Sequence, residues 1–150
     1  MSKQFDVKYM DLDLKTTEKF ETIKHLANLM EERLIDVDKY IEDVKSREAM
    51  STTGIGDGVA IPHAKSEWVK EPTVVVGKSS RGIEWQSLDD EPVNLVFLIA
   101  VPEGEGNEHL KILQALAVSL IDDEFKEKIQ NATDKKIIEE LLIKKTNRTS

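Results

Sequence analysis

The sequence predicts an α/β fold with a mixed β-sheet and helices on both of its faces. Apolar runs of strand length alternate along the chain with segments whose apolar residues recur at helical spacing. The longest apolar run covers residues 93–101 and is interrupted by Asn94, which indicates a central strand buried on both faces. A chain of 150 residues suffices for one domain with a substantial core. We therefore expect a single domain over residues 1–150, with its core at about 7–143.

The first part of the chain predicts one short strand and two helices. Alternating apolar residues allow a strand over residues 7–14. Apolar residues at helical spacing then indicate a helix over about 18–33, which Thr16 or Thr17 would cap. The same spacing indicates a second helix over about 36–49.

The second part of the chain predicts further strands, followed by three helices. Runs of β-branched residues bounded by Gly or Pro are typical of buried strands, and leucine and isoleucine at helical spacing are typical of packed helices. The expected strands cover residues 59–61, 73–76, 83–85 and 93–100, with a turn over 77–82. The expected helices begin after Asn107, after Asp122–Asp123 and at about Asp134, and the last one ends near Lys144.

The composition excludes several classes of function. The formal net charge of -8 argues against a nucleic-acid surface, because phosphate contacts need clustered Lys and Arg. The chain has no cysteine, so disulfides and thiolate chemistry are excluded. No apolar run is long enough to cross a bilayer, and the first residues lack the apolar core of a signal peptide. We expect a cytoplasmic protein without direct membrane insertion.

A glycine-rich stretch leads to a histidine. Gly54, Gly56 and Gly58 occupy alternate positions, so the backbone there can reach positive φ and approach a small ligand closely. Successive exposed amides of this kind suit an anion. A short apolar segment then ends at Pro62, whose restricted φ helps to deliver His63. No helix follows the glycines and no Gly-Lys-Ser/Thr occurs, which argues against a dinucleotide fingerprint and a P-loop.

The residues around His63 indicate phosphoryl chemistry. A histidine can be a base, a metal ligand or a nucleophile, and its neighbours decide among these roles. Arg47 lies upstream as a fixed positive charge that can hold phosphate oxygens, so the combination favours a histidine that accepts and passes on a phosphoryl group. A metal site built from His63 and His109 is the weaker alternative, since their spacing matches no compact ligand motif. His25 lies off the apolar stripe of its helix, and we expect a surface residue without a role.

Two segments of the sequence resemble one protein family. Arg47-Glu48 and the string STTGIGDGVAIPHA over residues 51–64 look like the active-site signature of the enzyme IIA component of the bacterial sugar phosphotransferase system, fructose and mannitol type. The segment EHLKILQALA over residues 108–117 is similar to the family's other recurring motif and contains His109. The resemblance runs over about 9–142, and the fructose-specific members are the most similar.

The resemblance implies a reaction and a set of roles. In that family the matching histidine is phosphorylated by the histidine phosphocarrier protein and hands the group to a cysteine of the IIB component, which serves a membrane IIC component. Carried over, His63 is the phosphorylated residue with Nε2 as the attacking atom, while His109 and Arg47 orient or stabilise the phosphoryl group. No metal or other cofactor is expected, because a phosphohistidine donor already carries an activated group. The expected phosphate-binding residues of the loop are Thr53, Gly54, Gly56 and Gly58.

The resemblance leaves two functional roles open. The nitrogen-related regulatory members share the same active-site string, so a protein that controls a partner through its phosphorylation state is the alternative to a component of sugar transport. For a transport component, fructose and related hexoses or polyols are all compatible with the sequence, because the membrane component chooses the sugar.

Overall fold

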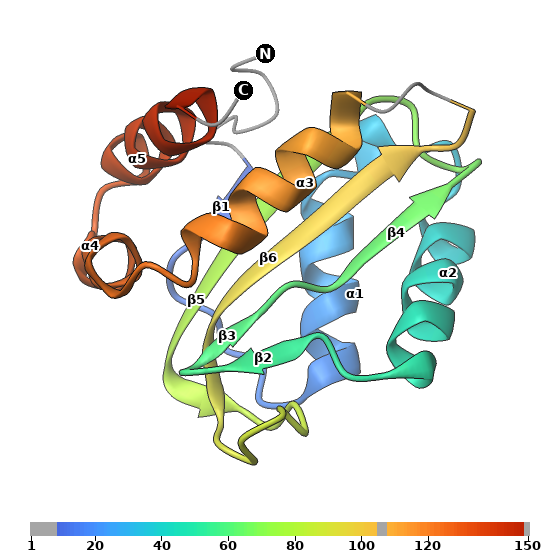
Figure 1. Ribbon diagram of the computed structural model, residues 1–150. Helices are drawn as coiled ribbons and strands as arrows, with labels where there is room; N and C mark the ends of the chain where they lie inside the picture. The colour runs from blue at the N-terminus through green and yellow to red at the C-terminus, as the bar shows by residue number, and fades with distance from the viewer. Residues whose placement is uncertain (1–8, 105–107, 149–150) are drawn as a thin grey trace.

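A six-stranded mixed β-sheet forms the centre of the molecule in the computed structural model, which describes residues 9–104 and 108–148 (Figure 1). The strands are β1 (Met10–Asp11), β2 (Gly54–Gly56), β3 (Val59–Ala60), β4 (His63–Ser66), β5 (Thr73–Ile83) and β6 (Val93–Pro102). Their order is β1-β5-β6-β3-β2, and β4 pairs with β6 beyond β3. The β5–β6 and β2–β3 pairs are antiparallel, whereas β1, β3 and β4 pair in parallel with β5 or β6.

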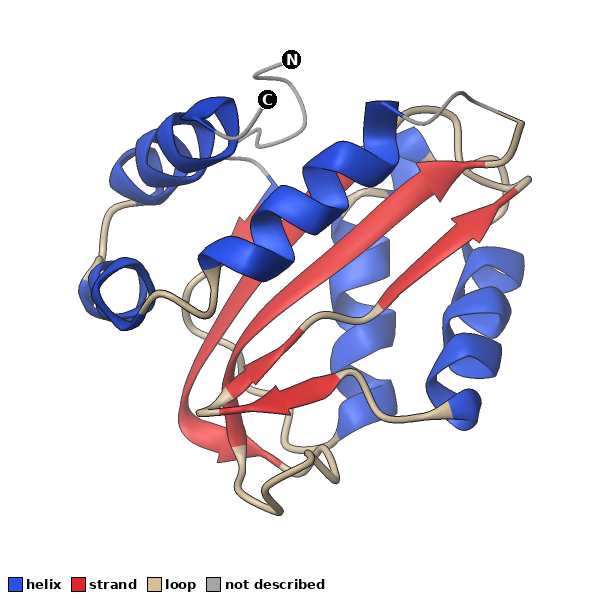
Figure 2. Ribbon diagram, viewed as in Figure 1, coloured by secondary structure: helices blue, strands red, loops and turns tan. Residues whose placement is uncertain are grey.

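Helices cover both faces of this sheet (Figure 1 and Figure 2). The helices α1 (Lys19–Leu29) and α2 (Val37–Met50) pack on one face. The helices α3 (Glu108–Ser119), α4 (Asp123–Asn131) and α5 (Lys135–Arg148) lie on the other. The predicted fold class is therefore confirmed. Within the described residues, no helix is both long and apolar enough to cross a membrane.

The central strand β6 separates two hydrophobic cores. Leu98 packs with residues of α1 and α2, whereas Phe97 and Ile99 pack with residues of α3, α4 and α5. Every residue of the strand except Asn94 is buried. A strand that is covered on both faces needs a nearly continuous apolar run, so the run over residues 93–101 predicted it correctly.

The predicted cap of the first helix is wrong. Glu18 takes the capping position of α1 without a side-chain hydrogen bond. The Thr16 hydroxyl is hydrogen-bonded to the Thr22 hydroxyl at 2.6 Å, and the Thr17 amide donates to Glu21 Oε1 at 3.0 Å. Both threonines therefore form hydrogen bonds with side chains of α1, and neither threonine side chain caps the helix. The helix also ends earlier than expected, and a short 3-10 turn over Glu31–Arg33 follows it.

The strand β5 is longer than the sequence predicts. Two glycines and the polar residues between them predict a turn over residues 77–82, but the strand continues to Ile83. Lys78 pairs with Leu95 and Ile83 pairs with Val93, so a bulge absorbs the extra residues against β6. Pairing with the buried central strand outweighs the local preference for a turn.

Other boundaries differ at the ends of elements. Residues 7–8 of the predicted first strand and Asn107, the predicted cap of α3, lie outside the described residues. The last helix continues to Arg148, beyond the predicted end near Lys144. The strand that begins at His63 is missing from the sequence-based prediction, because its polar residues do not form an apolar run.

Replacing Asp36 by alanine is expected to lower the free energy of unfolding by about 1 kcal/mol, because this residue caps α2. Its Oδ1 accepts a hydrogen bond from the Lys39 amide at 3.1 Å. Urea denaturation of the wild type and the variant measures the loss. Asp36→Asn retains a side-chain acceptor and should keep most of the stability, so an equal loss in both variants would contradict the capping role.

His25 has a structural partner that the sequence did not predict, and its side chain is partly exposed. Its Nε2 lies 2.7 Å from Asp11 Oδ2, which ties α1 to β1. Burial by itself raises the pKa of Asp11, but hydrogen bonds from the Asp13 amide and the His25 ring, with the charges of His25 and Lys135, lower it by more. The resulting pKa of Asp11 lies below its ordinary value of 3.8.

Asp11→Asn is expected to remove a contribution to stability that depends on pH. The pKa of Asp11 is lower in the folded than in the unfolded state. Its carboxylate therefore stabilises the fold at pH values above the unfolded pKa, which is near 3.8. This contribution is lost as the pH falls through the folded pKa. The difference in melting temperature between wild type and variant should therefore be largest at neutral pH and vanish in strong acid.

The control for this pH series is Asp13→Asn. The Asp13 carboxylate pairs with Lys15 at 3.0 Å, and both side chains are largely exposed. Exposed pairs contribute little to stability, so this variant should melt close to the wild type at every pH. A melting difference for Asp11→Asn that stays constant with pH would exclude ionisation of Asp11 as its source.

Candidate functional site

His63 is the first residue of β4, and the backbone two residues earlier fixes its ring. Nδ1 lies 2.7 Å from the carbonyl oxygen of Ile61. A carbonyl oxygen can only accept, so Nδ1 carries the hydrogen, and in the neutral ring the lone pair is on Nε2. The residue is partly exposed. The geometry therefore leaves the free lone pair on Nε2, which is the atom that the family resemblance suggests for attack.

Hydrogen bonds on two sides hold the segment that carries His63. The Ile61 amide donates to the Thr53 carbonyl at 3.0 Å, which ties this segment to the start of the hairpin. The Ile99 amide of β6 donates to the Pro62 carbonyl at 3.0 Å, and His63 itself pairs with Ile99 in the parallel ladder. The central strand and the hairpin thus position the histidine together.

The glycines form a β-hairpin turn instead of an open loop beside the histidine. The φ angles are +100° at Gly56, +56° at Asp57 and +79° at Gly58, and glycine adopts such left-handed conformations without steric cost. The Gly58 carbonyl accepts from the Leu95 amide at 3.0 Å. His63 pairs with Ile99 of β6. At the usual rise of a strand, Ile99 lies about 13 Å along β6 from Leu95. The structure does not bring Gly56 and Gly58 together with His63.

Donor groups that the sequence assigns to phosphate have partners within the fold. The Gly54 amide donates to Thr52 Oγ1 at 3.1 Å. Thr53 donates through its amide and its hydroxyl to the two carboxylate oxygens of Glu48. These contacts stabilise the junction between α2 and the hairpin. Phosphate binding by the loop stays a prediction for Thr53, Gly54, Gly56 and Gly58.

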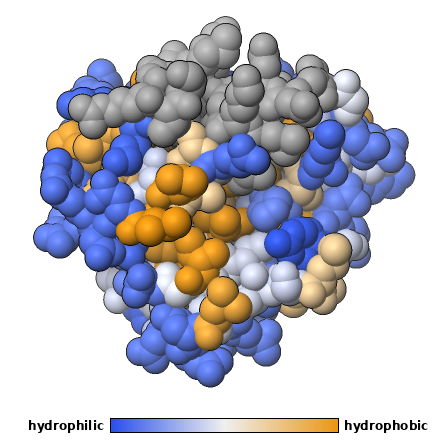
Figure 3. Space-filling view, viewed as in Figure 1, coloured by the Kyte–Doolittle hydropathy of each residue, from blue (hydrophilic) through white to orange (hydrophobic). Residues whose placement is uncertain are grey.

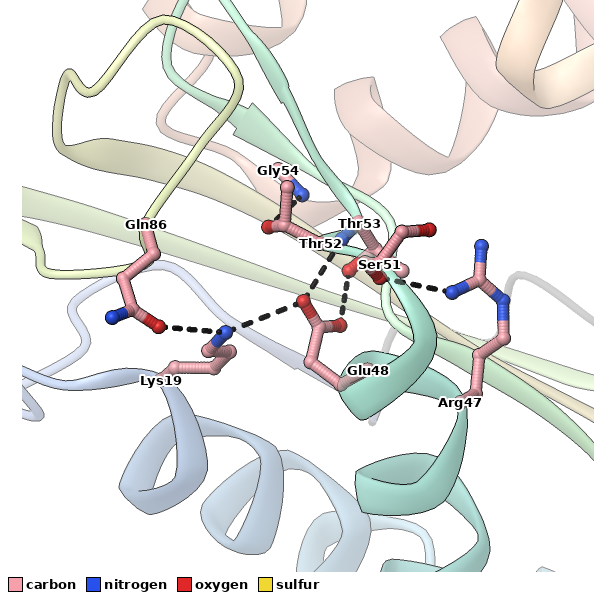
Figure 4. Close-up of polar contacts among 8 residues, drawn as sticks. All are labelled: Lys19, Arg47, Glu48, Ser51, Thr52, Thr53, Gly54 and Gln86. Atoms are coloured by element: carbon pink, nitrogen blue, oxygen red, sulfur yellow. Dashed lines mark hydrogen bonds and ion pairs between the residues drawn. The ribbon is translucent and has the colours of Figure 1, made fainter.

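Arg47 lies in the last turn of α2, as the sequence predicts. Its Nη1 donates to the Ser51 carbonyl at 3.0 Å across the end of the helix (Figure 4). This contact and the helix dipole both favour a cation here. The side chain is partly exposed, and one hydrogen bond uses one of the five N–H donors of a guanidinium. Arg47 therefore retains donors that can bind an anion.

His109 occupies the first turn of α3, which is the position that the sequence predicts. A helix N-terminus favours anions. The side chain of His109 lies outside the described part of the structure, so its placement beside His63 stays a prediction. Among the residues that are described, no group of three or more His, Cys, Asp or Glu side chains could hold a metal ion.

Glu48 is a residue of this region whose contacts the sequence reasoning missed. Its side chain is 1% exposed and lies on the face of α2 that also carries the buried Ile41 and Val44. Positions 41, 44 and 48 follow helical spacing, so the pattern contained a signal for the burial of Glu48. The partners that a buried carboxylate needs come from outside the helix, and no local pattern identifies them.

Comparison with family models gives a match over residues 3–145 to the family described as phosphoenolpyruvate-dependent sugar phosphotransferase system, EIIA 2. The match contains the motifs of His63 and His109. The chain belongs to this family. EIIA components are phosphotransferases that use a phosphohistidine intermediate. The resemblance read from the two motifs is confirmed.

Relatives of this EIIA chain with similar sequences are components of the same phosphotransferase system. It is 40% identical over 110 residues to the fructose-specific EIIA component of Haloferax volcanii, and the alignment covers 73% of this chain and 71% of that protein. It is 35% identical over 133 residues to the fructose-specific EIIABC component of Bacillus subtilis. That alignment covers 87% of this chain and 21% of the longer relative.

Solved structures show the same fold. The nitrogen regulatory protein IIA-Ntr from Neisseria meningitidis superposes with a TM-score of 0.87 at 25% identity, over 94% of this EIIA chain and 97% of that one. A complex of enzyme IIAMtl with phosphorylated enzyme IIBMtl from Escherichia coli gives a TM-score of 0.77 at 22% identity, over 93% of this chain and 96% of that one. This EIIA chain therefore has the architecture of solved EIIA proteins.

Proposed function

We propose that this EIIA chain takes a phosphoryl group onto Nε2 of His63 and passes it to a cysteine of a IIB component. The 2.7 Å contact between His63 Nδ1 and the Ile61 carbonyl carries the proposal. This contact leaves the lone pair on Nε2, in a chain whose family works through phosphohistidine. The phosphorylated residue is thus the one histidine that stands in the first family motif.

Both transfer steps are in-line substitutions at phosphorus. In the first step, Nε2 of His63 forms an N–P bond, the donor's N–P bond breaks, and its electron pair returns to the imidazole of the histidine phosphocarrier protein. In the second step, the IIB thiolate forms an S–P bond and the N–P bond of His63 breaks. Arg47 and His109 would stabilise charge on the transferring oxygens. The donor is already activated, so the transfer needs no metal or other cofactor.

The partners in this proposal follow from the reaction and the relatives. The face drawn in Figure 3 carries apolar side chains over the strands and α3. Exposed apolar residues of these elements include Ile55 and Val118, and an apolar area of this kind suits a protein partner.

The names of the two relatives support fructose or a related hexose or polyol as the sugar. The membrane IIC component would be served through IIB, which places this chain in the cytoplasm.

A regulatory role is the second candidate. The Neisseria meningitidis structure, with its TM-score of 0.87, is a nitrogen regulatory protein. Sequence favours transport, because the identity is 25% to that protein and 40% to the fructose-specific component of Haloferax volcanii.

Incubation with phosphoenolpyruvate, enzyme I and the histidine phosphocarrier protein tests the proposal. Intact-mass analysis should show the gain of one acid-labile phosphoryl group, and a fructose-type IIB component added afterwards should take it over. No gain from a donor that phosphorylates another EIIA protein would refute the phosphocarrier function. A gain without transfer to IIB components of the fructose and mannitol types would favour the regulatory candidate.

A further inference from the structure

The buried carboxylate of Glu48 clamps the residue that leads into the hairpin (Figure 4). Oε2 accepts from the Thr53 amide at 2.8 Å, and Oε1 accepts from the Thr53 hydroxyl at 2.6 Å. A carboxylate that is removed from water is costly unless such donors satisfy it. The two hydrogen bonds therefore fix Thr53 relative to the end of α2.

Lys19 balances the charge of this carboxylate from α1. Its Nζ lies 3.5 Å from Glu48 Oε2 and 3.5 Å from Gln86 Oε1, and its side chain is 11% exposed. Both oxygens of Glu48 thus have a donor, and one of them has two. The contacts join α1, α2, the hairpin and the segment after β5 at one point (Figure 4).

The contact between Glu48 and Thr53, which we call the clamp, is connected to the ring of His63 through the backbone of Thr53 and Ile61. The Thr53 carbonyl accepts from the Ile61 amide at 3.0 Å, and the Ile61 carbonyl accepts from His63 Nδ1 at 2.7 Å. Glu48 therefore acts on the same backbone segment that orients the ring. A shift of the Ile61 carbonyl would lengthen or bend the hydrogen bond to Nδ1, and hydrogen bonds weaken steeply with poor alignment.

We propose that Glu48 is a positioning residue that holds the ring of His63 in the Nδ1–H tautomer, acting through Thr53 and Ile61. A free imidazole prefers the Nε2–H tautomer, in which Nε2 has no lone pair for attack. The Ile61 carbonyl reverses this preference, and Glu48 keeps that carbonyl in place. The consequence for phosphoryl transfer rests on the proposed function, whereas the tautomer is a property of the unphosphorylated protein.

Two variants weaken the clamp with little change in shape, and two others serve as controls. Glu48→Gln keeps the size of the side chain, but an amide has one acceptor oxygen for the two donors of Thr53. Thr53→Val removes the hydroxyl, and Thr53→Ser retains it. Asp36→Ala loses the cap at the other end of the same helix and touches no atom of the path to His63.

The experiment measures the tautomer of His63 by long-range proton–nitrogen NMR of the imidazole in alkaline buffer. The wild type, Thr53→Ser and Asp36→Ala should hold the Nδ1–H form. In Glu48→Gln and Thr53→Val the population of the Nε2–H form should rise severalfold. The kcat of phosphorylation should fall about tenfold in these two variants with the KM for the donor unchanged, a loss typical of removing an outer partner of a functional histidine.

A wild-type tautomer in both Glu48→Gln and Thr53→Val would overturn the proposal, whatever their rates of phosphorylation. Rates that fall equally in Asp36→Ala would also overturn it, because the loss would then follow from general destabilisation. If Glu48→Gln does not fold, the comparison of Thr53→Val with Thr53→Ser decides. Failure of the wild type to accept phosphate would refute the proposed function, while the NMR result would still decide the positioning role.

Discussion

His63→Ala is expected to accept no phosphoryl group from the histidine phosphocarrier protein, while His109→Ala still gains one. The reason is that, in the proposed function, His63 supplies the nitrogen that forms the N–P bond, and its other nitrogen is held at 2.7 Å from the Ile61 carbonyl. His109 is expected to orient or stabilise the group without carrying it, so its variant should be phosphorylated more slowly. Intact-mass analysis after incubation with the complete donor system measures both outcomes.

His25→Ala is the matched control for these histidine variants. It removes an imidazole whose contact is with Asp11. It should therefore be phosphorylated at the rate of the wild type. A phosphoryl group on the His63→Ala variant, or its absence from wild type and His109→Ala alike, would contradict the assignment of His63 as the carrier.

Gly54→Ala is expected to lower the free energy of unfolding by about 2–3 kcal/mol, at the upper end for overpacking a core. A Cβ at this position would lie 2.4 Å from Ser87 Oγ, 2.9 Å from Trp85 Cδ1 and 3.0 Å from the Ser87 Cα. Trp85 is fully buried, so its ring has no space into which it can move. Urea denaturation of wild type and variant measures the loss, and the variant that remains folded should still be phosphorylated.

Gly104→Ala separates crowding from backbone strain. Apart from the chain neighbours of Gly104, no atom of the described residues lies within 4 Å of a Cβ built there, but its φ is +83°. Strain at that φ should cost about 1 kcal/mol, less than the crowding at Gly54. If Gly54→Ala is as stable as the wild type but is no longer phosphorylated, then Gly54 serves the phosphoryl group, as the sequence predicts, and the packing explanation is wrong.

Much of the fold could be predicted because its signals are local. The run over residues 93–101 identified the strand that both cores share, and helical spacing identified the five α-helices of the described residues to within a few residues. The helices predicted to begin at about residue 36 and after Asp122–Asp123 do begin there, and the side chains of Asp36 and Asp122 accept hydrogen bonds from helix amides. These features depend on residues that are a few positions apart, so they can be predicted from a single sequence.

The candidate site could be predicted only in part. The motif predicted that Arg47 lies in the last turn of α2, which is confirmed, and the roles of His63 and Arg47 toward phosphate stay predictions. It assigned the glycines to phosphate, although the register of β3 on β6 places Gly58 well away from His63. That register depends on which strand the hairpin pairs with, and local spacing does not contain it.

The sequence by itself determined the fold class, the buried central strand and the family, whose first motif contains His63. Tertiary structure decided the continuation of β5 through a predicted turn, the pairing of His25 with Asp11, and the clamp of Glu48 on Thr53. The physical reason is that the intrinsic preferences of residues for helix, strand or turn are local and amount to at most about 1 kcal/mol for most residues. Strand pairing and the burial of a carboxylate involve larger energies, and they depend on partners that only the folded chain brings together.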